Sequence, residues 1–148
     1  MARLRGFTLI EVMVVFAIMA LIMAIAPVAY DRLRDSAQYR DVVRGMVVGM
    51  RAARQQAVLS GRDALFNVDL AQRLYGLEGT PGHAIPDTVS VRATVASGEA
   101  QGERFAIRFL SSGGASGGSV DVVKPSGDGV RLRVDWFSGR VEQEALRP

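Results

Sequence analysis

The N-terminal part of the chain carries a long apolar run. No charged residue occurs from Val12 to Tyr30. These nineteen residues, at about 1.5 Å of helical rise each, nearly match the roughly 30 Å of a bilayer core. Arg3 and Arg5 precede the run, and the positive-inside tendency places them in the cytoplasm. The pattern predicts a single membrane-spanning helix, with the rest of the chain on the outer side.

Beyond Pro27 the apolar positions recur at steps of three and four, which is the period of a helix with one apolar face. They are Leu33, Ala37, Val43, Met46, Val47, Met50, Ala53, Ala57 and Val58. Gly61 follows as a stop signal. The two segments together predict one long helix from about Thr8 to Ser60. Its second half needs another layer to cover the apolar face.

After Gly61 the pattern changes to short alternating runs separated by turn residues, which is typical of strands. The predicted strands are Ala64–Leu70, Arg73–Leu77, Thr88–Val95, Arg104–Leu110, Ser119–Lys124, Val130–Phe137 and Arg140–Gln143. Leu70–Arg73 and Pro125–Gly129 read as hairpin connections, and Glu78–Asp87 reads as a loop. The expected class is therefore α+β: a long N-terminal helix packed on a C-terminal antiparallel β-sheet head.

Composition excludes several classes of function. The 148 residues suffice for one modest domain. Without cysteine, the chain has no disulfides, zinc–thiolate sites or cysteine nucleophiles. The single histidine, His83, lies in the loop rich in Pro and Gly, so no catalytic triad or multi-histidine metal site can form. We expect neither an enzyme nor a bound cofactor or metal.

The charge distribution argues against nucleic acid as a partner. The net charge is +3, but residues 62–148 hold ten basic and eleven acidic side chains. A nucleic-acid site needs a clustered positive face. The Gly-rich stretch Ser111–Ser119 lacks the Lys-Ser/Thr ending of a phosphate loop, so we interpret it as a mobile connection between strands. We interpret Trp136 as a core residue.

Three interpretations compete for the apolar run. A cleaved secretory signal would be cut near Ala24–Ala26, where Pro27 is unfavourable for cleavage. A plain single-span anchor explains every feature except Glu11, because a carboxylate in an apolar helix is costly and usually has a partner. The third interpretation starts from that acidic residue.

The residues Arg5-Gly6-Phe7-Thr8-Leu9-Ile10-Glu11, followed by the apolar run, resemble the type IV prepilin signal shared by pilins and type II secretion pseudopilins. The resemblance implies that a prepilin peptidase cuts between Gly6 and Phe7, and that Phe7 is then N-methylated. It also implies that Glu11 pairs with the Phe7 amine of a neighbouring subunit during filament assembly. A buried carboxylate and a buried ammonium are each costly alone, and their pairing offsets much of that cost.

The same resemblance divides the chain into four parts. Residues 1–6 form the leader peptide, with Arg3 and Arg5 as its positive-inside charges. Residues 7–30 form the half of the helix that spans the membrane or lies in the filament core. Residues 31–61 form the amphipathic half, and residues 62–148 form a periplasmic head.

Three later stretches extend the resemblance over nearly the whole chain. Arg51–Val58, Phe109–Gly118 and Val134–Val141 are similar to segments of the GspH/FimT family of pilin-like proteins, which includes minor pseudopilin H of type II secretion. This implies a minor pseudopilin that helps to start or cap the periplasmic pseudopilus driving protein export. The expected location is the bacterial inner membrane, with a single span.

The resemblance also implies the partners. They are other pseudopilins, both major and minor, the inner-membrane platform protein and the prepilin peptidase. The alternative is a FimT-like minor pilin of a type IV pilus that contacts DNA, with Arg131, Arg133 and Arg140 clustered across adjacent strands.

Overall fold

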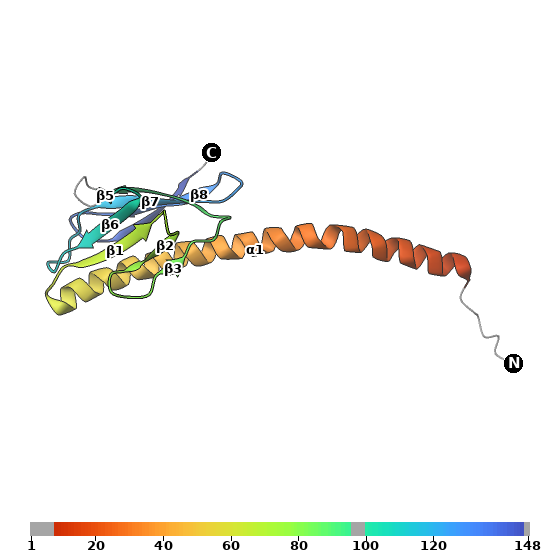
Figure 1. Ribbon diagram of the computed structural model, residues 1–148, viewed down its shortest axis with the longest axis horizontal. Helices are drawn as coiled ribbons and strands as arrows, with labels where there is room; N and C mark the ends of the chain where they lie inside the picture. Colours follow the sequence, from red (N-terminus) through yellow and green to blue (C-terminus); the bar gives the residue numbers. More distant parts are fainter. Residues whose placement is uncertain (1–7, 96–99, 147–148) are drawn as a thin grey trace. The chain divides into compact units, whose positions relative to one another are not determined.

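The computed structural model describes residues 8–95 and 100–146, without the side chains of residues 24–29 and 31–32 (Figure 1). One helix, α1, spans Leu9–Ser60, and the bounds predicted from periodicity are confirmed. The chain divides into two compact units, Met1–Asp35 and Ser36–Pro148, which are treated separately below. The α+β class, with antiparallel strands following a long N-terminal helix, is also confirmed.

The second unit contains two antiparallel sheets where one was expected. The five-stranded sheet has the order β3-β2-β1-β6-β5, and the four-stranded sheet has the order β4-β7-β8-β9. The strands are β1 Ala64–Asp69, β2 Leu74–Leu77, β3 His83–Ala84, β4 Ser90–Val95, β5 Ala100–Gln101, β6 Arg104–Phe109, β7 Gly118–Val123, β8 Gly129–Val134 and β9 Val141–Leu146.

Seven of these strands overlap the predicted ones, and both predicted hairpin connections join paired strands. The short strands β3 and β5 were not predicted, and β3 lies inside the segment expected to be a loop. The strand predicted over Val130–Phe137 ends early, at Val134. It ends there because Asp135 begins a tight turn, in which its Oδ1 accepts hydrogen bonds from the backbone N–H and the hydroxyl of Ser138 (both 2.7 Å).

The core of this unit lies between the helix and the strands of both sheets (Figure 1). Met46, Met50, Ala53 and Ala57 of α1 are fully buried, as their helical spacing predicted. Fully buried strand residues include Phe66, Phe109, Val120, Val122 and Leu132. The helix approaches β1 closely at Gly49, where a Cβ atom would lie 2.6 Å from Cε2 of Phe66. The α1 residues from Val42 to Ala57 are therefore one layer of the head.

The Gly-rich connection between β6 and β7 joins two strands as predicted, but the expectation of a mobile loop needs correction. Gly113, Gly114 and Ala115 are buried. The backbone N–H of Ala115 donates to the carbonyl of Trp136 (2.8 Å), and that of Ser116 donates to Arg108 (2.8 Å). A Cβ on Gly114 would lie 3.0 Å from the Trp136 carbonyl oxygen, so the glycine allows two backbones to pack closely. The loop is a packed part of the head.

Candidate functional site

The first turn of α1 carries the residue on which the assembly prediction depends. The backbone N–H of Glu11 donates to the hydroxyl of Thr8 (3.3 Å) and to its carbonyl (3.1 Å), so Thr8 caps the helix. Glu11 is exposed, and within the described residues its carboxylate has no ion-pair partner. A carboxylate in a first turn is favoured by the helix dipole. The carboxylate of Glu11 is therefore accessible at the N-terminal end of α1.

Apolar side chains surround this carboxylate on the helix surface. All large hydrophobic residues that the structure describes in this stretch are exposed: Leu9, Ile10, Val12, Met13, Val14, Val15, Phe16, Ile18, Met19, Leu21, Ile22 and Met23. A helix that is apolar on every side is stable only when lipid or other apolar chains surround it. Among the described residues, no helix is both long enough and apolar enough to cross a membrane.

The predicted processing site lies outside the described residues. This applies to the cleavage site between Gly6 and Phe7, to the methylated residue Phe7, and to the leader charges Arg3 and Arg5. Glu11 is the one predicted site residue that the structure places.

In the head, Arg54 of α1 holds two loops together. Its Nε donates to the carbonyl of Gly113 in the Gly-rich loop (3.1 Å) and to that of Ser138 in the turn between β8 and β9 (3.0 Å). The turn is closed further by the backbone N–H of Gly139, which donates to the carbonyl of Asp135 (2.8 Å). The two hydrogen bonds from Ser138, reinforced by the charge of Arg133, lower the pKa of Asp135. This network fixes the shape of both loops.

The same turn presents two aromatic side chains to solvent, so the interpretation of Trp136 as a core residue is wrong. Trp136 is 69% exposed and Phe137 is 77% exposed. Their rings meet edge to face, with centroids 5.8 Å apart. The reason is the Asp135–Ser138 turn, which ends the inward–outward alternation of β8 before Trp136. The motif Asp-x-x-Ser-Gly is the sequence signal that could have indicated this turn.

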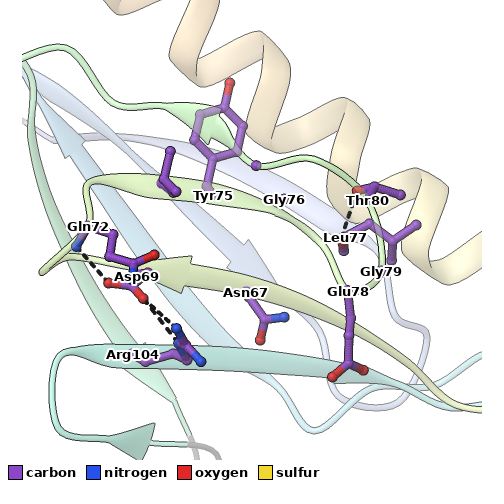
Figure 2. A pocket seen from close by; sticks show the side chains of 12 residues that line it. Asn67, Asp69, Gln72, Tyr75, Gly76, Leu77, Glu78, Gly79, Thr80 and Arg104 are labelled. Carbon is purple, nitrogen blue, oxygen red and sulfur yellow. Dashed lines mark hydrogen bonds and ion pairs between the residues drawn. The ribbon is translucent and has the colours of Figure 1, made fainter.

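A shallow pocket of about 290 Å³ lies along β1, β2 and the loop that follows β2 (Figure 2). At one end Asp69 accepts hydrogen bonds from the backbone N–H of Gln72 (2.8 Å) and from Nη2 of Arg104 (2.8 Å). These two contacts, the Gln72 bond first, lower the pKa of Asp69. Figure 2 shows Tyr75 pointing away from this carboxylate, towards α1. Asp69 thus closes the β1–β2 turn and pairs with Arg104 of β6, and Figure 2 shows no interaction of Glu78 with the other residues drawn.

The outer face of the four-stranded sheet carries paired charges. Arg131 of β8 binds Asp121 of β7 through two hydrogen bonds (2.7 and 2.8 Å). Arg133 binds Glu142 (3.0 Å) and Glu144 (3.3 Å) of β9. Arg131, and secondarily Arg92, lower the pKa of Asp121 against the effect of burial. Two of the three arginines considered for DNA contact are therefore neutralised within the sheet.

His83, the single histidine, lies in β3, where its ring packs against Tyr75 (centroids 5.5 Å apart). Among the described residues, no three side chains of the metal-ligating types His, Asp and Glu gather to hold an ion.

Two family models match the chain. Residues 1–27 match the family model described as the prokaryotic N-terminal methylation motif, and residues 43–139 match the model described as type II transport protein GspH. The chain is 30% identical over 148 residues to type II secretion system protein H of Xanthomonas campestris pv. campestris, covering 98% of this chain and 86% of that protein.

Among solved structures, the minor pseudopilin EpsH from the type 2 secretion system of Vibrio cholerae aligns with a TM-score of 0.49 at 14% identity, covering 77% of this chain and 95% of that one. The family model covers more than half of the present sequence, and the identity to the Xanthomonas protein extends over nearly all of it. The chain belongs to the GspH family of type II transport proteins.

Proposed function

We propose that this protein helps to start or cap the periplasmic pseudopilus of type II secretion. Its function as a minor pseudopilin follows from its family, and it acts as a structural subunit and not as an enzyme. The observation that carries the proposal is the presence, in one chain, of an N-terminal methylation motif and a GspH head. A filament subunit needs both parts: a terminus that enters the filament and a head that contacts its neighbours.

In this proposal the peptidase removes residues 1–6, the new amino group of Phe7 is methylated, and Glu11 binds the Phe7 amine of an adjacent subunit. The exposed carboxylate of Glu11 in the first turn of α1 supports this role. A charged side chain costs about 2.5–3.5 kcal/mol at the centre of an apolar span, and less near its end. An ammonium group from a neighbour would offset that cost, so the pair would form only on assembly.

The methylation motif and the family suggest a subunit anchored in the inner membrane. We propose a single span within residues 7–30 and a head in the periplasm. The exposed apolar side chains from Leu9 to Met23 support this arrangement, because they need an apolar environment. The proposed partners are the other pseudopilins, the platform protein and the prepilin peptidase.

The DNA-binding alternative receives less support from the head. Arg131 and Arg133 form ion pairs with carboxylates on neighbouring strands, so they are poorly placed to neutralise phosphates. Of the three arginines, Arg140 alone is left without an ion pair among the described residues.

The test is genetic complementation combined with N-terminal analysis. We expect deletion of the gene to reduce type II secretion, and the wild-type gene to restore it. The restored protein should begin at methylated Phe7, as measured by mass spectrometry of the membrane extract. Gly6→Ala should leave the leader attached and fail to restore secretion. Normal secretion after deletion, or a functional wild-type protein that begins at Met1, would contradict the proposal.

A further inference from the structure

A groove in the head runs between α1 and the adjoining strands β8 and β9. It has a volume of about 460 Å³, and the residues that line it come from four turns of the helix and from one position on each strand. They are Tyr39, Arg40, Val43, Arg44, Val47, Val48, Arg51, Val130 and Gln143. We call it the arginine groove. It belongs entirely to the unit Ser36–Pro148.

The floor of the arginine groove is apolar. Val43 and Val130 are partly buried and pack against the core, and Val47 is buried. Val48, by contrast, is 58% exposed. An apolar floor with an exposed apolar edge is the composition expected at the centre of a protein contact, where charged residues are depleted.

The rim of the arginine groove is positively charged and not neutralised. Arg40, Arg44 and Arg51 are exposed, and among the described residues none of the three has an ion pair or a side-chain hydrogen bond. Arg131 and Arg133, on the outer face of the sheet, are in contrast held by carboxylates. The free guanidinium groups of the rim therefore retain their donors for another molecule.

The alternation of β9 explains why no acid from that strand reaches the rim. Glu142 and Glu144 pair with Arg133 on the outer face, so Gln143 between them is the β9 residue that lines the groove. At one end of the groove Nζ of Lys124 lies over the ring of Tyr39, 4.8 Å from its centroid. Burial, and secondarily the negative charge of Asp128, raise the pKa of Tyr39. The two strand residues that line the groove, Val130 and Gln143, are therefore uncharged, and the positive charge of the rim comes from the helix.

The positive rim continues past Arg51. A second recess is lined by Arg51, Arg54, Gly139, Arg140 and Val141, so Arg51 is shared between the two hollows. Arg54 is engaged by the carbonyls of Gly113 and Ser138, whereas Arg140 adds another exposed cation. The result is a strip of four exposed arginines, Arg40, Arg44, Arg51 and Arg140, that have no ion pair among the described residues and lie beside an apolar floor.

We propose that the arginine groove binds an acidic, amphipathic segment of another pseudopilin of the same filament, an inference that rests on the proposed function. Apolar side chains of the segment would cover Val48 and fill the floor. Its Asp and Glu side chains would accept paired hydrogen bonds from the guanidinium forks of Arg44 and Arg51, which suit carboxylates geometrically. A nucleic acid would need the arginines but would leave the valine floor uncovered, so the apolar floor favours a protein partner.

The experiment uses the full chain expressed in its own secreting cell. A photo-cross-linking phenylalanine analogue replaces Val48, with Leu59, an exposed residue outside the groove, as the control position. We expect a light-dependent adduct with another pseudopilin from position 48 and little or none from position 59. The double variant Arg44→Glu/Arg51→Glu should reduce this adduct about tenfold or more, because each lost charge-assisted bond alone accounts for about that factor.

The matched control for charge reversal is Arg62→Glu, which makes the same change on an exposed arginine outside the groove. It should leave the adduct unchanged. Arg44→Lys/Arg51→Lys keeps the charge but removes the planar fork, so it should give an intermediate yield. Thermal unfolding of each purified variant checks that the head is folded, and the lysine variant tests the inference even if charge reversal destabilises the chain.

Three outcomes would overturn the inference. They are an adduct that survives charge reversal, an adduct from position 48 no stronger than from position 59, or salt-sensitive DNA binding that depends on Arg44 and Arg51.

The proposed function has a separate test. If deletion abolishes secretion but groove variants secrete normally and leave the adduct unchanged, the groove inference alone fails. If deletion leaves secretion normal, the proposed function fails.

Discussion

Gly139, in the turn between β8 and β9, allows a sharp test of how the head holds its two loops together. Its φ angle is +62°, and a Cβ atom there would lie 2.5 Å from the carbonyl oxygen of Gly113 and 3.0 Å from Nε of Arg54. Gly61 offers a matched control, since its φ is +66° but no atom lies within 4 Å of the place that a methyl group would take. Alanine at either position therefore meets the same backbone strain, and only at Gly139 does it also meet a steric clash.

The backbone strain and the steric clash give the expected loss of unfolding free energy in each variant. The left-handed conformation costs about 1–2 kcal/mol for a residue with a Cβ, so Gly61→Ala should lower the free energy of unfolding by that amount. At Gly139 the methyl group must also displace Gly113 or Arg54, which weakens at least one hydrogen bond between the guanidinium and a carbonyl. Such a bond contributes about 1.5–3 kcal/mol. We expect Gly139→Ala to cost about 2.5–5 kcal/mol.

The assay is thermal unfolding of the full chain in detergent, followed by circular dichroism and by the fluorescence of Trp136, the only tryptophan. For a unit of this size about 1 kcal/mol corresponds to roughly 4 °C in Tm. Gly139→Ala should therefore lower Tm by about 10–20 °C, and Gly61→Ala by about 4–8 °C. Equal shifts for the two variants would refute the reasoning, because the contact with Gly113 and Arg54 would then have no energetic consequence.

Three further predictions concern assembly, pH and the core. Glu11→Ala should be processed normally but co-purify poorly with the other pseudopilins, as measured by pull-down from membranes; normal co-assembly would contradict the pairing. Asp69, Asp121 and Asp135 have pKa values lowered below 3.8 by folding, so their stabilisation is present above about pH 4 and is lost as the pH falls through their folded values. Tm should therefore drop between about pH 5 and pH 2, by less in Asp69→Asn, as an unfolding series would show. Met46→Ala, at a fully buried position, should cost about 2–5 kcal/mol in urea unfolding, whereas a cost below about 1 kcal/mol would mean that the site collapses freely.

The helix and most strands could be predicted because their signals are local. The apolar stripe that includes Met46, Met50, Ala53 and Ala57 recurs at helical spacing, and all four residues are buried. The alternation of β1 and β7 likewise indicated strands that are present. The division into two sheets was not predictable, since it depends on which strands pair across long separations, as β1 and β6 do.

The features that the sequence did not indicate depend on contacts between distant segments. Trp136 continues the alternation of β8 in the sequence, and only the Asp135–Ser138 turn takes it out of the strand. The Gly-rich loop has the composition of a mobile connection, yet Arg54, far away in the sequence, binds its backbone. The arginine groove combines helix and strand residues that no single periodicity links.

The apolar surface of the first unit and its carboxylate, Glu11, have separate roles in the proposed filament. Each large apolar side chain from Leu9 to Met23 gains about 1.5–3 kcal/mol on full burial, so together they far outweigh the roughly 2.5–3.5 kcal/mol cost of one carboxylate. The apolar surface therefore makes burial favourable, but it does not distinguish lipid from neighbouring subunits, because lipid tails are as apolar as leucine.

Glu11 is the group that can make this distinction. Lipid chains offer its carboxylate no partner, whereas the Phe7 amine proposed for a neighbouring subunit does. Replacing Glu11 with alanine should thus leave retention in the membrane intact or strengthen it, while removing the preference for the filament. A Glu11→Ala protein that is lost from the membrane fraction would show that the carboxylate serves anchoring, and the assignment of separate roles would be wrong.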